Sequence, residues 1–162
     1  MTKILIVYYS LTGNTQFIAE AMRDSIEADI LELKPIKELK ADSGSRIILG
    51  GFQSTTKKKP ELMDFDINPL EYDLIILGTP VWAWNISAPM RSFLSMFDLT
   101  GRKVALWMCH GGDGIKAMGR FKEILESANI VESISFQEPL KKESDENKEK
   151  AIAWAKEVAI KV

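Results

Sequence analysis

The sequence predicts an α/β fold in three layers, with a five-stranded parallel sheet between two layers of helices. Two observations support this prediction. Short apolar runs alternate with helical patterns along the chain, and the strongest of these runs lack the polar face of a half-exposed strand. Strand, helix and strand repeated in this way give a parallel sheet with right-handed crossovers and helices on both faces, and the order expected for it is the doubly wound 2-1-3-4-5. With 162 residues, the chain is expected to form a single domain over residues 1–162.

The expected strands differ in how completely they are apolar. Residues 4–8, 74–77 and 104–108 are apolar on both alternating faces, which is typical of central strands covered by helices on each side. Residues 30–33 form a weaker run, and residues 130–136 alternate more between apolar and polar. These two segments are therefore predicted to lie at or near the edges of the sheet.

Four helices follow from apolar residues at helical spacing. They are expected within residues 17–26, 89–97, 115–128 and 151–162, with Pro89 in a first helical turn, where proline is tolerated.

The segment from Pro35 to Tyr72 is the weak point of this assignment, because a compact domain rarely contains so long a loop. A short second crossover helix is predicted near residues 45–52, and an exposed loop over residues 54–66.

Composition excludes several classes of function. The formal net charge is −2, so no broad basic field exists to hold a nucleic acid. No apolar run approaches the ~18 residues of a membrane span, and the first run is too short for the core of a signal peptide. The single cysteine, Cys109, permits no internal disulfide and no thiolate metal site of its own. These features predict a cytoplasmic protein without a nucleic-acid partner, a membrane span or a metal.

Hydroxyl and amide side chains follow the first strand directly. The segment Ser10-Leu11-Thr12-Gly13-Asn14-Thr15 precedes a helix, and free N–H groups with the positive end of a helix dipole form an anion site. No Lys or Arg occurs from Ser10 to Met22, so a phosphate held here would be bound by dipoles. The alternative is a simple helix cap, because Ser, Thr and Asn are common capping residues. The motifs for nucleoside triphosphates and for a Rossmann dinucleotide site are absent.

Two further segments follow the third and fourth strands. Gly78-Thr79-Pro80-Val81-Trp82-Ala83-Trp84-Asn85 is expected to be a loop with two indoles, which could stack on a flat ligand or pack in the core. Cys109-His110-Gly111-Gly112-Asp113-Gly114 has three glycines that free the backbone to follow the edge of a ring. In the order 2-1-3-4-5 all three segments belong to neighbouring strands, and ligands bind at this edge of an open parallel sheet.

These three segments resemble the flavodoxin family, over nearly the whole domain, through Ser10-x-Thr12-Gly13-Asn14-Thr15, Gly78-Thr79-Pro80-x-Trp82 and the glycine-rich segment at Cys109. The resemblance implies a flavodoxin-like fold and one bound FMN. The residues that it assigns to the FMN site are Ser10, Leu11, Thr12, Gly13, Asn14, Thr15, Thr79, Pro80, Val81, Trp82, Ala83, Trp84, Cys109, His110, Gly111, Gly112 and Gly114.

The resemblance also implies a role for each segment. Residues 10–15 would hold the phosphate, Trp82 would stack on the isoalloxazine, and Trp84 would be a second aromatic contact. The peptide around Ala83 and Trp84 would face the redox nitrogen of the ring, and residues 110–114 would line its pyrimidine edge. Many flavodoxins place a third-loop tyrosine on the other ring face, and residues 109–116 contain none. That face would be open or covered by another side chain.

Three functions follow from this resemblance. The first is an electron carrier that docks with redox partner proteins, which we favour over a turnover enzyme because the sequence has no obvious nicotinamide site. The alternative is an FMN-dependent NAD(P)H:quinone-type oxidoreductase that reduces small electron acceptors. The third, a module that keeps the fold without the flavin, is disfavoured by the two tryptophans beside an intact phosphate turn. The protein is expected to be a monomer or a weak dimer.

Two other features have ordinary interpretations. Cys109 and His110 are adjacent on an extended strand and point to opposite faces, so we expect no thiolate and base pair. The cluster Lys57-Lys58-Lys59 is expected in a solvated loop, with contact to an acidic redox partner as the alternative.

Overall fold

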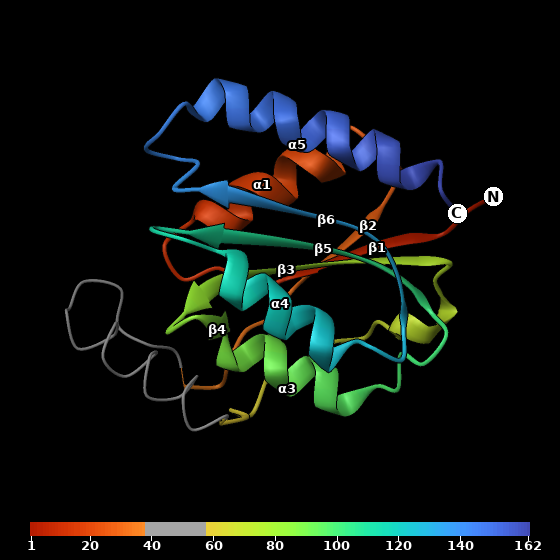
Figure 1. Ribbon diagram of the computed structural model, residues 1–162. Coiled ribbons are helices and arrows are strands. Elements are labelled where there is room, and N and C mark those ends of the chain that lie inside the picture. Colours follow the sequence, from red (N-terminus) through yellow and green to blue (C-terminus); the bar gives the residue numbers. More distant parts are fainter. Residues whose placement is uncertain (38–57) are drawn as a thin grey trace.

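The computed structural model describes residues 1–37 and 58–162. Within them, five parallel strands follow the order β2-β1-β3-β5-β6, and a short strand, β4, pairs antiparallel with β3. Figure 1 shows α1 and α5 on one face of the sheet and α3 and α4 on the other. The predicted three-layer fold and strand order are therefore confirmed, because β5 and β6 are the fourth and fifth parallel strands along the chain.

The described elements are as follows. The strands are β1 (Ile4–Tyr8), β2 (Asp29–Glu32), β3 (Leu74–Trp82), β4 (Asn85–Ile86), β5 (Lys103–His110) and β6 (Asn129–Gln137). The helices are α1 (Asn14–Arg23), α3 (Ala88–Met96), α4 (Ile115–Ile124) and α5 (Ser144–Ala159), with a short 3-10 helix at Pro69–Glu71. None of these helices is both long and apolar enough to cross a membrane.

The sheet separates two hydrophobic cores. One core lies against α3 and α4 and includes Val7, Phe93 and Phe121, whereas the other lies against α1 and α5 and includes Ile6 and Trp107. Every residue of β1 is buried, as expected for a strand covered on both faces. Each large side chain that is fully buried contributes roughly 1.5–3 kcal/mol to the stability of the fold. The two cores therefore hold the central strands, and with them their carboxyl ends, in place.

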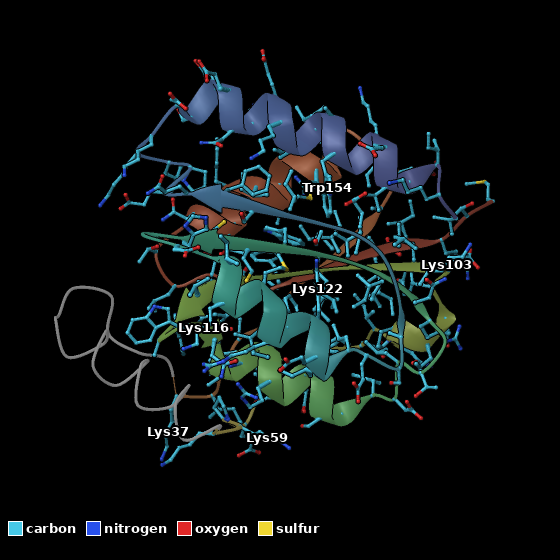
Figure 2. All side chains as sticks on the ribbon, in the orientation of Figure 1. Lys37, Lys59, Lys103, Lys116, Lys122 and Trp154 are labelled. Atoms are coloured by element: carbon cyan, nitrogen blue, oxygen red, sulfur yellow. The ribbon has the colours of Figure 1, made fainter. Side chains whose placement is uncertain are left out.

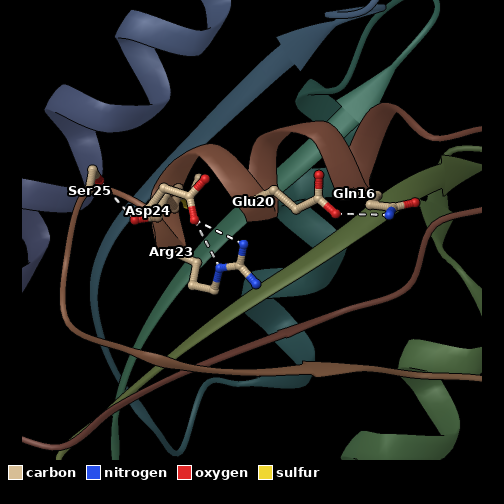
Figure 3. A network of polar contacts seen from close by, with 6 residues as sticks. Gln16, Glu20, Arg23, Asp24 and Ser25 are labelled. Atoms are coloured by element: carbon tan, nitrogen blue, oxygen red, sulfur yellow. Dashed lines mark hydrogen bonds and ion pairs between the residues drawn. The ribbon is translucent and has the colours of Figure 1, made fainter.

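Helix α1 ends earlier than the apolar pattern predicted. The Ser25 hydroxyl donates to the Met22 carbonyl at 2.8 Å, and polar contacts continue along the helix, with Arg23 paired to Asp24 at 2.9 Å (Figure 3). Gln16 donates to Glu20 at 2.9 Å on the same helix. The last turn of α1 is therefore closed by a side chain, and Ile26 lies beyond the helix although its side chain packs against the core.

Strand β3 is longer than predicted, because Gly78 to Trp82 form strand where the sequence suggested a loop. Gly78 pairs with Tyr8 and with Trp107, and a Cβ at Gly78 would lie 1.9 Å from the Trp107 ring. Strand β1 pairs with β3 only as far as Gly78, so the missing N–H of Pro80 does not interrupt that ladder. Glycine here makes room for the indole of the neighbouring strand.

The end of α4 and the start of α5 do not coincide with the ends of their apolar faces. Helix α4 stops at Ile124, and Leu125 closes it, although the apolar pattern continued to Ala128. Helix α5 begins at Ser144, and its first two turns are polar and largely exposed, ahead of the apolar face that starts at Ala151.

The segment between β2 and β3 is described only from residue 58. Residues 58–66 are irregular and mostly exposed, as predicted, apart from an isolated bridge between Leu62 and Pro35. Lys58 and Lys59 are exposed in this loop. The helix predicted near residues 45–52, the start of the loop at residues 54–57 and Lys57 lie outside the described residues.

Candidate functional site

The three predicted segments lie at one edge of the sheet. They follow or form the carboxyl ends of β1, β3 and β5, which are neighbours in the sheet. The arrowheads at the left of Figure 1 mark this edge. The placement predicted from the strand order is therefore confirmed.

The start of α1 is open to a ligand. Gly13 is its N-cap residue, with φ 97° and ψ −13°, and no side chain accepts a hydrogen bond from the first turn. The plain helix cap that the sequence allowed is therefore not what the hydroxyls form. First-turn N–H groups that lack protein acceptors, together with the helix dipole, favour an anion at this point.

The hydroxyl groups of this loop have protons left to donate. Ser10 Oγ accepts from the Gly13 N–H at 3.2 Å, and Thr12 Oγ1 accepts from the Asn14 amide at 3.2 Å. Because each hydroxyl accepts in these contacts, its own proton remains available to an anion. Asn14 in turn accepts from the Leu140 N–H at 3.1 Å, so the loop after β6 fixes the amide that orients Thr12.

Thr15 and Cys109 lie beneath this loop rather than at its surface. The Thr15 side chain is buried and hydrogen-bonds the Cys109 thiol, which packs in the core against α1 and α5. Burial raises the pKa of Cys109 to about 12, and the Thr15 contact opposes this rise only weakly. Only the backbone of these two residues can reach a ligand. Leu11 likewise packs its side chain against the opposite core.

The second segment is a β-hairpin. Trp82 pairs with Asn85, and the two residues between them have left-handed backbone, with φ 48° at Ala83 and 59° at Trp84. Trp82 is only 9% exposed and meets Tyr9 edge to face at 5.5 Å, whereas Trp84 is 62% exposed. Core packing, one of the two interpretations that the sequence allowed, therefore describes Trp82, and the accessible indole is that of Trp84.

Thr79 supports the hairpin from inside. Its hydroxyl accepts from the Ser87 N–H at 2.9 Å and lies 2.9 Å from Ser87 Oγ, which in turn caps α3. Pro80 and Val81 continue the strand, opposite Cys109 and Ile86. The Thr79 side chain is fully buried, so its contribution to a ligand site is through the position of the hairpin.

The third segment has an open backbone. A Cβ added at Gly111 or Gly112 would meet nothing within 4 Å, and both residues are exposed. The His110 imidazole packs against Gly114, where a Cβ would lie 2.8 Å from its Cδ2 atom. His110 also lines a hollow of about 830 Å³ between α4 and β6. Met108 and Cys109 belong to opposite cores, so the adjacent residues of β5 alternate between faces as expected.

Two residues at this edge had no signal in the sequence. Arg120 of α4 donates from Nη1 to the Trp84 carbonyl at 3.1 Å, and Leu140 holds Asn14 as described above. Both contacts join residues far apart in the chain, and neither residue belongs to a recognisable motif. Within residues 1–37 and 58–162, no group of three or more His, Cys, Asp or Glu could hold a metal ion.

The fold and this edge define an α/β protein whose first helix begins without a side-chain cap, at the sheet edge that also carries an exposed indole. A family model described as Flavodoxin matches residues 3–155. The chain belongs to the flavodoxin family.

Individual relatives agree with this assignment. A flavodoxin from Maridesulfovibrio salexigens is 28% identical over 100% of both chains. An NAD(P)H dehydrogenase (quinone) from Archaeoglobus fulgidus is 32% identical over 67% of this chain, which spans only 54% of that relative. A solved flavoprotein in complex with FMN from Lactobacillus acidophilus has a TM-score of 0.73 and 24% identity, over 89% of this chain and 98% of its own.

Proposed function

We propose that this protein binds one FMN at the carboxyl edge of its sheet and transfers electrons between redox partners through it. The observation that carries the proposal is the open start of α1, where no side chain caps the first turn and two hydroxyl protons are free beside it. Family membership supports the same cofactor. The solved flavoprotein of similar fold contains FMN.

The phosphate of FMN would lie at residues 10–15. Ser10 and Thr12 would donate hydroxyl protons, and the backbone of Gly13 to Thr15 would donate N–H groups. Asn14 would act mainly by orienting Thr12, because its amide is already bonded on both sides. Because the loop has no cation, phosphate binding would depend on aligned dipoles. Loss of one hydroxyl should therefore weaken FMN binding strongly.

The ring would lie between the second and third segments. Trp84 offers the exposed indole, which would stack on one face of the flat ring. Trp82 would support the hairpin from below, and the peptide between Ala83 and Trp84 would approach the redox nitrogen. The open backbone of Gly111 and Gly112, with His110 and Gly114 beside it, would line the pyrimidine edge.

FMN supplies the redox chemistry when bound, accepting electrons and protons at its ring. The chain needs no general acid or nucleophile for this function. Its residues hold the phosphate at α1, exclude water from one ring face with Trp84, and present backbone groups to the ring edge. The potential would then be set by the difference in hydrogen bonding and electrostatic interaction between the protein and the oxidised and reduced forms of FMN.

The phosphate assignment is tested with Thr12→Val and two ligands that differ only by the phosphate. Removal of one hydrogen bond to a charged group costs about 1.5–3 kcal/mol, so FMN binding should weaken by roughly 10- to 100-fold. Riboflavin binding should change little. Thr2→Val, an exposed threonine away from the site, is the matched control. Equal losses for FMN and riboflavin would contradict the assignment, and failure of the wild-type protein to bind FMN would overturn the proposed function.

A second candidate is reduction of quinones by NAD(P)H. It is favoured by the similarity to NAD(P)H dehydrogenases (quinone), about half of whose length this chain spans, and by the third segment, which has no tyrosine to cover the other ring face. The FMN-loaded protein is mixed with NADPH and a quinone, without an added reductase. Rapid NADPH oxidation would favour the enzyme, and its absence would favour the carrier.

We also propose a single domain over residues 1–162, a cytoplasmic location and a monomer or weak dimer in solution. One continuous sheet, which joins strands from Ile4 to Gln137, supports a single domain. The single cysteine, buried at 5% exposure, is compatible with a reducing compartment. Docking with redox partners would use the exposed edge that carries Trp84.

A further inference from the structure

The hairpin turn that carries Trp84 is held by an arginine from another helix. Arg120 Nη1 donates to the Trp84 carbonyl at 3.1 Å, across 36 residues of sequence. We propose that Arg120 is a positioning residue that clamps this turn toward the flavin and adds a fixed positive charge beside it. The inference rests on the proposed function, since it concerns how the turn meets FMN.

The turn needs such support because its backbone is strained. Ala83 and Trp84 are both left-handed, at φ 48° and 59°, a conformation that costs a residue with a side chain about 1 kcal/mol each relative to glycine. Strained positions persist only where the surroundings fix them. Below the turn, Trp82 packs on Tyr9, and the last strand pair joins Trp82 to Asn85. The guanidinium of Arg120 fixes the tip.

The clamp determines which peptide is left for the ligand. With its carbonyl bonded to Arg120, the peptide between Trp84 and Asn85 cannot rotate freely. The peptide between Ala83 and Trp84 has no hydrogen-bond partner in the described part of the chain. Because the clamp fixes its neighbour, this free peptide and the Trp84 indole are presented together.

Arg120 contributes positive charge to a part of the molecule that has few cations. The first loop has no Lys or Arg from Ser10 to Met22, and the chain as a whole has a net charge of −2. On α4, Lys116 lies one helical turn before Arg120 and Lys122 follows it (Figure 2), and Lys122 lines the hollow next to β6. Arg120 is thus a cation tied directly to the turn, and it should favour reduced FMN, which carries additional negative charge.

The first test needs no ligand. The protein is labelled with 5-fluorotryptophan, and its four indole resonances are assigned by single Trp→Phe variants, including Trp84→Phe. Arg120→Ala should shift and broaden the Trp84 resonance, because the tip then samples other conformations. The resonances of Trp107 and Trp154, buried in the opposite core, should stay in place. An unchanged Trp84 resonance would overturn the clamp.

The second test measures the affinity for oxidised and reduced FMN. Arg120→Ala should weaken oxidised FMN about tenfold and reduced FMN about a hundredfold, which lowers the two-electron potential by about 30 mV. Arg120→Gln keeps a donor without the charge, so oxidised FMN should weaken less than threefold and reduced FMN about tenfold. Arg120→Lys keeps the charge and an N–H group that can donate to the carbonyl, so both affinities should stay within threefold.

Lys116→Gln is the matched control, since it removes a charge from the same helix and leaves the hydrogen bond between Arg120 and the turn in place. It should change both affinities less than twofold. Arg120 variants that behave like this control would overturn the inference while leaving FMN binding intact. A wild-type protein without FMN affinity would instead overturn the proposed function and the electrostatic effect together, and the fluorine spectrum would still decide the clamp.

Discussion

The loop that follows β1 and the hairpin turn that follows β3 are held in place in opposite ways. The loop of residues 10–15 is held mainly by its own residues, whose hydroxyls and N–H groups bond to each other, and Leu140 adds a hydrogen bond from a distant part of the chain. Glycine occupies its left-handed position at Gly13. The turn at Ala83 and Trp84 has left-handed residues with side chains, held by contacts from Tyr9 and Arg120. A loop of the first kind can be recognised in a sequence, whereas the second exists only because of its surroundings.

Gly78 lies in β3 beside the end of β1, and its substitution should have the largest effect on stability. A Cβ at this position would lie within 1.9 to 2.3 Å of three atoms of the Trp107 ring, which is fully buried and cannot move aside. Gly78→Ala should lower the free energy of unfolding by about 3 kcal/mol, measured by urea denaturation.

Gly119→Ala provides the control for the Gly78 variant. Gly119 lies within α4, and an added Cβ there meets nothing within 4 Å. The substitution should stabilise the protein by about 0.5–1 kcal/mol, because alanine favours helix over glycine. Similar effects of the two substitutions would show that the indole does not occupy the space over Gly78.

Arg91 distinguishes the two regions by charge. The first loop has no cation, whereas α3, which follows the hairpin, contains Arg91, a residue that is 9% exposed. Its Nε and Nη2 atoms are buried without a hydrogen-bond partner in the described part of the chain, and burial lowers the pKa of Arg91. A buried unpaired charge is costly, so Arg91→Met should raise the free energy of unfolding by about 2 kcal/mol.

Arg91→Lys is the control for charge, because it leaves a cation in the same place. It should give no gain in stability, and thermal and urea unfolding of both variants measure the difference. If Arg91→Met gives no more stability than Arg91→Lys, the guanidinium would have to be paired in solution.

Gly13 and Gly101 compare the same backbone strain at two places. Both are left-handed, at φ 97° and 73°, but a Cβ at Gly13 would lie 3.3 Å from Leu140, and one at Gly101 would meet nothing within 4 Å. Each change to alanine should cost about 1–2 kcal/mol of stability. Only Gly13→Ala should also weaken FMN, by displacing the N–H groups of α1. Equal loss of FMN affinity in both variants would contradict the phosphate site.

The sequence was sufficient for the features that local patterns encode. Fully apolar runs predicted the central strands, and the doubly wound order expected for the sheet is the one observed. The first loop was recognisable because its residue types act on their own neighbours. Its hydroxyls were correctly placed at the start of a helix, although the helix proved to have no side-chain cap.

Contacts between distant residues could not be predicted in the same way. Trp82 and Trp84 are two residues apart and would share a face on a continuous strand, so the pattern could not tell which one is exposed. The left-handed turn after Trp82 redirects Trp84 outward, and that turn depends on Arg120. The sequence assigned Thr79 to the ligand site but gave no sign that its hydroxyl joins β3 to the start of α3. Nothing near these residues in the sequence signals their partners.

Cys109 gives the smallest predicted effect, and it shows how closely the first loop is packed on β5. Burial raises the pKa of the thiol to about 12, so it stays neutral in the folded protein across ordinary pH. In the unfolded chain it ionises above about 8.5, and stability is therefore complete below that value and declines as pH rises above it. Between pH 7.5 and 9 this contribution should be about 1 kcal/mol. Urea unfolding of wild type and Cys109→Ala over this range measures it, because the difference between the two should shrink as pH rises. A constant difference would mean that the thiol ionises equally in both states, and hence that the contact between Thr15 and Cys109 is open to water.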